Sequence, residues 1–127
     1  MTRLLSAIPL LSTLAWGQTE NIVDVGYWAP SNNATLAPGM WGYVDGGREY
    51  ALFTTQSPGG VIAVDITDPV NPREKGFVSS PNSIWQEVRN FRNTAYKISQ
   101  QGTVGLQIVN LDSLAAGNEN ALLGNMA

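Results

Sequence analysis

The chain contains no cysteine and no histidine, and only 13% of its 127 residues are charged. These absences exclude disulfide bridges, thiol nucleophiles and a histidine general base, and they remove the commonest zinc ligands. The net charge of -3 offers no basic surface for phosphate groups, so we expect no nucleic-acid partner. A hydrophobic fraction of 43% argues against disorder, which goes with low hydrophobicity and high net charge. We therefore expect a folded domain with neither a cofactor nor a metal ion.

The first 17 residues have the layout of a secretory signal peptide. Arg3 supplies a basic start, an apolar run extends from Leu4 to Leu14, and the small residues Ala15 and Gly17 suit a cleavage site. The apolar run is too short to cross a bilayer, which needs roughly 20 residues. We therefore predict a secreted protein with a signal peptide at 1–17 and no membrane span in the mature chain.

Beyond residue 20 the sequence consists of short runs rich in Val, Ile, Tyr, Phe and Trp, separated by Gly, Pro, Asn and Asp. This pattern, without a sustained helical period, predicts an all-β antiparallel fold. Asp45-Gly46-Gly47 and Pro58-Gly59-Gly60 favour tight turns between strands. The predicted strands are Ile22–Trp28, Trp41–Asp45, Glu49–Thr55, Val61–Ile66, Glu74–Ser79, Ile84–Phe91, Thr94–Ser99 and Leu106–Leu111.

The strand pattern repeats after about 45 residues. Residues 49–54 fall on residues 94–99, and residues 60–66 fall on residues 105–111, without a gap. A unit of this length with four short strands has the size of a β-propeller blade. We therefore predict an incomplete propeller of about two and a half blades, with an inserted loop at 29–39. A β-sandwich is the alternative, because the same alternation occurs there without a strict repeat.

Five stretches of the chain resemble the LVIVD-repeat β-propeller proteins, and more narrowly the choice-of-anchor B family. The most specific of them contains the pattern Asp-x-x-Asp-Pro-x-x-Pro, which begins at Asp65. The family tends to have Trp-Arg-Asp where this chain has Trp85-Gln86-Glu87. The resemblance implies an extracellular propeller over residues 18–114 and no shared catalytic residues. The five stretches are Trp41–Asp45, Arg48–Leu52, Val64–Pro72, Ser83–Val88 and Gly105–Leu111.

The length of the chain conflicts with a closed propeller. Closure needs at least four blades, or roughly 180 residues at this repeat length, which is more than residues 18–127 provide. Residues 115–127 are rich in Asn, Gly and Ala, and we expect them to be the irregular end of a truncated product. Missing blades or self-association would then be needed to close the ring.

One predicted strand carries a candidate ligand-binding site. Alternation along Ile84–Phe91 places Trp85, Glu87 and Arg89 on one face, where the two charged side chains can pair. A carboxylate beside a guanidinium stays ionised, which suits ligand binding better than general-acid catalysis. A structural ion pair and an aromatic packing contact would explain the same residues. Separately, Asn33-Ala34-Thr35 is an acceptor site for N-glycosylation in a eukaryotic host.

These observations favour a secreted, non-enzymatic propeller module that binds protein or glycan partners through Trp85, Glu87 and Arg89. The alternative is part of an extracellular propeller enzyme, a glycan hydrolase or lyase whose catalytic residues lie outside this chain. Serine and threonine are plentiful, but without histidine the sequence contains no base of the usual kind to activate them.

Overall fold

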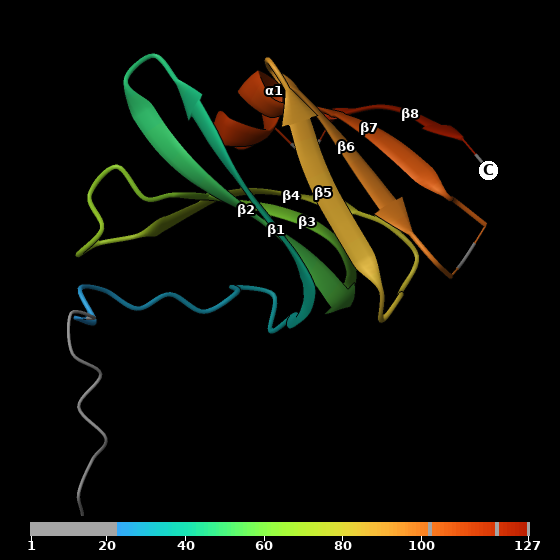
Figure 1. Ribbon diagram of the computed structural model, residues 1–127, viewed down its shortest axis with the longest axis horizontal. Helices are drawn as coiled ribbons and strands as arrows, with labels where there is room; N and C mark the ends of the chain where they lie inside the picture. Colours follow the sequence, from blue (N-terminus) through green and yellow to red (C-terminus); the bar gives the residue numbers. More distant parts are fainter. Residues whose placement is uncertain (1–22, 102, 119, 127) are drawn as a thin grey trace, which may run out of the picture.

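The computed structural model describes residues 23–126 except 102 and 119 (Figure 1). The predicted signal peptide at 1–17 and residue Ile22 of the first predicted strand lie outside the described residues. The remainder forms two four-stranded antiparallel sheets and one short helix. The prediction of an all-β antiparallel fold is therefore confirmed.

The first sheet has the strand order β1-β2-β3-β4, with neighbours along the chain paired as neighbours in the sheet. A two-residue turn joins the first two strands, and its Gly46 and Gly47 have φ of 55° and 78°, in the left-handed region that glycine adopts without strain. The four strands are β1 (Thr35–Asp45), β2 (Arg48–Ser57), β3 (Gly59–Asp65) and β4 (Arg73–Ser79). Each contains most of the strand predicted for it.

The N-terminal part of this region differs from the prediction in two ways. Strand β1 begins at Thr35, so part of the predicted loop at 29–39 is strand, with register shifts between Thr35 and Met40 where Pro38 lacks an amide donor. Residues 23–28, expected to form an outer strand with Ile22, contain no strand.

Residues 23–34 instead lie against the face of the first sheet that points away from the second sheet. Trp28 stacks on Phe53 of β2, with 5.4 Å between ring centres. Ser31 donates from its amide and its hydroxyl to the Glu74 carboxylate, at 2.9 and 2.7 Å. A side chain at Gly26 would collide with the carbonyl oxygen of Pro69, so the backbone packs directly there.

The second sheet has the order β5-β6-β7-β8. Its strands are β5 (Gln86–Phe91), β6 (Thr94–Ser99), β7 (Leu106–Asn110) and β8 (Leu122–Met126), and helix α1 (Leu111–Ala115) connects the last two. The expectation that residues 115–127 are irregular is wrong for β8, which pairs with β7. The helix begins where the Asn110 side chain accepts a hydrogen bond from the Ser113 amide at 2.8 Å.

The first hairpins of the two sheets have equivalent pairing. Asp45 pairs with Arg48 and Phe91 with Thr94, so each pair closes the two-residue turn between the first two strands of its sheet. This correspondence is an offset of 46 residues, and it matches Leu52 of β2 to Ile98 of β6. We call the face that bears Tyr50 and Leu52, or Tyr96 and Ile98, the front face of its sheet, and the opposite face the back face.

This offset of 46 differs by one residue from the 45 at which the sequence segments align. The predicted offset matches Leu52 to Lys97, which lies on the back face, because a shift of one residue in a strand reverses every side chain. With the observed offset, the back face of the second sheet packs on the front face of the first, and the two sheets stack front to back.

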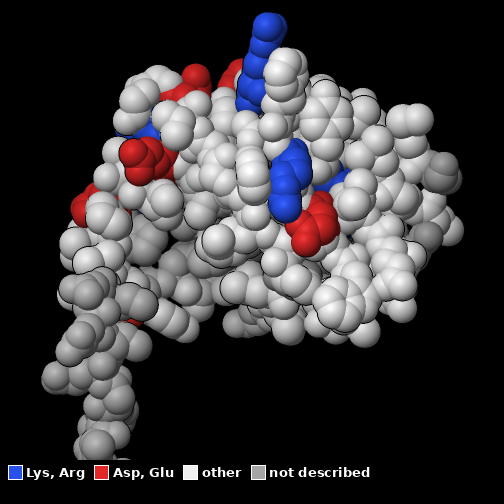
Figure 2. Space-filling view, in the orientation of Figure 1, with Lys and Arg blue, Asp and Glu red and all other residues white. Residues whose placement is uncertain are grey.

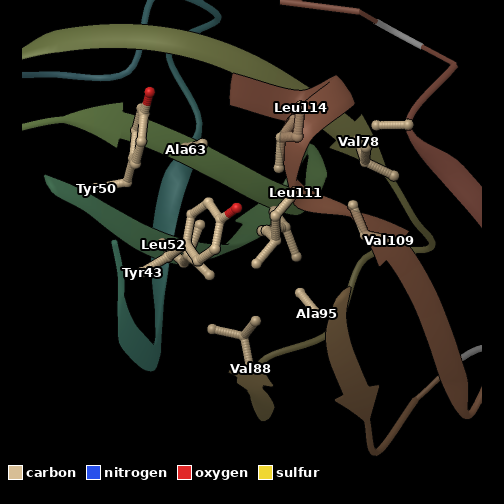
Figure 3. Packing of buried hydrophobic residues seen from close by; sticks show 12 residues of the cluster. Tyr43, Tyr50, Leu52, Ala63, Val78, Val88, Ala95, Val109, Leu111 and Leu114 are labelled. Carbon is tan, nitrogen blue, oxygen red and sulfur yellow. The ribbon is translucent and has the colours of Figure 1, made fainter. Parts of the chain in front are cut away.

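The hydrophobic core lies between the two sheets and includes the helix (Figure 3). Strands β1 and β2 contact β5, whereas α1 contacts β3 and β4, so the helix fills the space between the outer strands. Leu111 and Leu114 of α1 are buried there, which explains why this helix interrupts an otherwise all-β chain. The core residues are Tyr43, Tyr50, Leu52, Val61, Ala63, Val78, Val88, Ala95, Val109, Leu111, Leu114 and Ala121.

Candidate ligand-binding site on β5

The structure brings together the two charged residues predicted on β5. Arg89 Nη1 donates to Glu87 Oε2 at 2.9 Å, and both side chains are about half exposed, at 54% and 49%. Trp85 directly precedes the strand and is 61% exposed. The expected pairing of Glu87 with Arg89 is therefore present, beside an indole ring that is open to solvent.

The Arg89 guanidinium is held by contacts beyond Glu87. It also donates to the carbonyl oxygen of Val88 at 2.7 Å, and its central carbon lies 4.3 Å from the ring centre of Trp41 in β1. A guanidinium over an indole face is attracted by the ring's quadrupole. Sequence reasoning did not place Trp41 at this site. Trp41 and Arg89 lie on different sheets, and no local pattern connects them.

An open cavity of about 240 Å³ adjoins the site. Trp85 and Glu87 line it together with Ile98 of the neighbouring strand, and Gln86, Ser99 and Gln100 complete the wall. Pockets for drug-sized ligands are usually ~300–1,000 Å³, so this cavity suits a single ring. Figure 2 shows that the surface over the second sheet carries few charged side chains.

The turn that begins at Asp65 and the predicted glycosylation site at Asn33 both lie within the described residues. Asp65 accepts from the Thr67 amide and from Arg48, and Asp68 accepts from Asn71, so both carboxylates hold the turn. Hydrogen bonds, led by those from Thr67 and Asn71 respectively, lower the pKa of each carboxyl. Asn33 is exposed and has a φ of 55°, in the left-handed region where asparagine is enriched.

A second polar cluster joins the two sheets through α1. Asp112 accepts from the Tyr43 hydroxyl at 2.7 Å and from Asn93 Nδ2 at 2.8 Å. The two bonds, led by that from Asn93, lower the pKa of Asp112. Burial and the bond to Asp112 raise the pKa of the Tyr43 hydroxyl. The cluster fixes β1 and the β5–β6 turn to the helix, a structural role that sequence reasoning missed because Tyr43 and Asp112 lie far apart in the chain.

Replacing Asp112 by alanine should lower the free energy of unfolding by about 1–3 kcal/mol, because the Tyr43 hydroxyl loses its acceptor inside the structure. Urea unfolding monitored by tryptophan fluorescence measures the change. Asp45→Ala is the matched control, since Asp45 is exposed, and it should change the free energy by less than about 0.5 kcal/mol. Equal losses in the two variants would contradict the assigned role.

A third group of polar side chains is buried on the back face of the second sheet. Lys97 is fully buried, and its Nζ donates to Ser80 Oγ at 2.7 Å. Burial lowers the pKa of Lys97 to about 8. Beside it on β7, Gln107 donates to the Ser79 carbonyl oxygen at 3.1 Å, while its Oε1 has no hydrogen-bond partner among the described residues. These residues face the first sheet and are closed to solvent.

Within the described ranges, no group of three or more acidic residues could hold a metal ion, and no helix is long and apolar enough to cross a membrane. Comparison with models of protein families, with curated proteins and with solved structures found no match.

Proposed function

We propose that the chain forms part of a secreted, non-enzymatic β-propeller module of the LVIVD-repeat, choice-of-anchor B kind, and that it binds a glycan or protein partner through Trp85, Glu87 and Arg89. The observation that carries this proposal is the exposed Trp85 ring beside a fixed carboxylate–guanidinium pair at the edge of an open cavity.

The stacking of the sheets supports the propeller part of the proposal. Successive propeller blades are repeats of one four-stranded unit around an axis, so equivalent residues face the same way in each blade. Tyr50 and Leu52 of the first sheet and Tyr96 and Ile98 of the second have this relation. The sheets also approach each other through β1, β2 and β5, while α1 fills the space by β3 and β4. A wedge of this kind is what blades around a central axis require.

The side chains of the site suit a sugar ring better than a charged ligand. Glu87 and Arg89 neutralise each other, so the site has no net charge to attract an ion. A sugar presents an apolar face that can stack on the Trp85 indole, and hydroxyl groups that can donate to Glu87 and accept from Arg89. Ile98 closes the cavity with an apolar wall. A protein partner would have to insert one aromatic or amide side chain into the same space.

Titration of the chain with a panel of neutral oligosaccharides should quench or shift its tryptophan fluorescence. Trp85→Ala should weaken this binding by about tenfold or more, because the stacking surface is lost. Tyr27→Ala is the matched control, since Tyr27 is an aromatic residue outside the site and is 86% exposed. The affinity of this variant for the oligosaccharide should be unchanged. Equal weakening in both variants, or no response to any oligosaccharide, would contradict the proposed glycan site.

A further inference from the structure

We propose that the front face of the second sheet binds a second copy of this chain, so that two copies form a two-fold symmetric dimer. The inference rests on the proposed function, because it takes the face that carries Glu87 and Arg89 to be a binding surface, and it names a second occupant for that face.

The front face of the second sheet is apolar and uncovered. Phe91, Tyr96 and Ile98 are 66%, 40% and 53% exposed, and Met126 of β8 is 59% exposed. Single exposed apolar side chains are common on protein surfaces, but a contiguous group across β5, β6 and β8 indicates an interaction site. The face therefore has the character of an interface without a partner in the described chain.

The chain itself shows what covers such a face. Tyr50 and Leu52 are the equivalents of Tyr96 and Ile98 in the first sheet, and they are 7% and 0% exposed because the second sheet packs on them. The front face of this repeat is thus compatible with burial beneath another β-sheet. A flat sheet matches it in shape better than a helix or an extended peptide.

The other outer sheet face is less open to a second copy. Residues 23–34 cover part of the back face of the first sheet, where the Trp28–Phe53 stack and the two hydrogen bonds from Ser31 to Glu74 hold them, so another sheet cannot lie flat on it. The exposed apolar side chains of that back face lie along β1, at Leu36, Met40 and Val44. Among the described residues, the front face of the second sheet is therefore the broader surface for association. Two identical faces that meet form a two-fold interface, which closes at the dimer and does not grow into a filament.

The charges on the face are compatible with this symmetry. Glu87 and Arg89 supply one negative and one positive group on β5, so two copies do not repel each other. A two-fold axis beside β5 brings Glu87 of each copy toward Arg89 of the other. Opposite charges across an interface contribute to its orientation and specificity more than to its affinity.

The size of the face indicates a weak dimer. Four strands about 4.8 Å apart, each with about six residues spaced by about 3.3 Å, give a projected area of roughly 400 Å². Standard interfaces bury about 800 Å² of accessible surface on each partner, and protruding side chains make accessible surface larger than projected area. We therefore expect a dissociation constant on the order of 10–100 μM.

Sedimentation equilibrium of the full chain between about 5 and 500 μM tests the proposal. We expect a monomer–dimer equilibrium without larger species. Ile98→Glu should weaken dimerisation by about tenfold or more, because it places two uncompensated carboxylates in the interface. Tyr96→Ser should weaken it without adding charge. Val44→Glu is the control, since Val44 is 69% exposed on the back of β1, and its equilibrium should match that of the unchanged chain.

Three results would overturn the proposal: a monomer at every concentration, a series of oligomers beyond the dimer, or dimerisation of Ile98→Glu and Tyr96→Ser equal to that of the unchanged chain. Circular dichroism of each variant confirms its fold before the comparison. The oligosaccharide titration separates this inference from the proposed function. The titration is made at about 1 μM, where the chain is monomeric and its front face is open. A chain that dimerises at high concentration but binds no oligosaccharide as a monomer rejects only the glycan site. A chain that binds an oligosaccharide through Trp85 but stays monomeric at every concentration rejects only the dimer.

Discussion

Replacing Lys97 by methionine should raise the free energy of unfolding by about 2 kcal/mol at pH 7. Lys97 is fully buried between the sheets, and its described contacts include one hydrogen bond, to Ser80, and no carboxylate. An ammonium group taken out of water without an opposite charge costs several kcal/mol, part of which the hydrogen bond recovers. Methionine has a similar volume and removes that cost, while the Ser80 hydroxyl keeps its contact with the Pro81 carbonyl oxygen.

The same burial predicts how stability depends on pH. The pKa of Lys97 is about 8 in the folded chain, whereas a lysine exposed to water in the unfolded chain has a pKa of 10.5. Between these pH values the unfolded chain binds a proton that the folded chain has released. The free energy of unfolding therefore rises with pH across this window, by roughly 3 kcal/mol in all. Below pH 8 both states hold the proton, and this contribution to the pH dependence disappears.

Urea unfolding at pH 7.0, 8.5 and 9.5 measures this dependence, and comparison with Lys97→Met removes the contributions of all other groups. The unchanged chain should gain stability with each step, and Lys97→Met should show no such gain. Lys75→Met is the matched control, because Lys75 is the other lysine of the chain and is partly exposed. If the rise persists in Lys97→Met, another group causes it, and if stability falls with pH the assignment of a buried ammonium is wrong.

Local sequence patterns predict most of the strands because turns and alternation are local properties. The glycine pair at 46–47 and the proline–glycine group at 58–60 mark turns by the φ values that they permit. The runs of Val, Ile and Tyr between them require the pleated, buried surface of a strand. The pairing of Glu87 with Arg89 is predicted for the same reason, since both residues lie on one face of one strand.

The remaining features depend on contacts between distant parts of the chain. Ile22–Trp28 has the composition of a strand, but Trp28 stacks on Phe53 and is not paired in a sheet. Strand β8 is weakly apolar and contains Gly124 and Asn125, so its pairing with β7, not its own propensity, determines its conformation. The contact of Arg89 with Trp41 joins two sheets and has no signal in either segment.

A change of one residue in the offset between the two first hairpins changes which side chains are assigned to the front face of each sheet. Polarity matches an offset of 45 as well as one of 46, because both front and back faces of the sheets contain apolar residues. Only the pairing at the two hairpin turns selects 46. With that offset, Leu52 and Ile98 occupy the same position in the first hairpins of the two sheets, one covered by a sheet and the other open.

Alanine substitutions at these two equivalent positions should therefore have very different effects. Leu52→Ala should lower the free energy of unfolding by about 3 kcal/mol, because Leu52 is fully buried and its removal leaves a cavity between the sheets. Ile98→Ala should lower it by less than about 1 kcal/mol in dilute solution, because Ile98 is 53% exposed. Urea unfolding at low micromolar concentration measures both values in the monomer.

The comparison also connects stability to association. At concentrations where the front face of the second sheet is covered by a second copy, Ile98 becomes a buried residue like Leu52, and binding in the folded state adds to stability by mass action. The cost of Ile98→Ala should then increase with protein concentration, whereas the cost of Leu52→Ala should stay constant. Equal costs at the two positions in dilute solution would show that the front face of the second sheet is already covered, and the front-to-back relation of the two sheets would have to be revised.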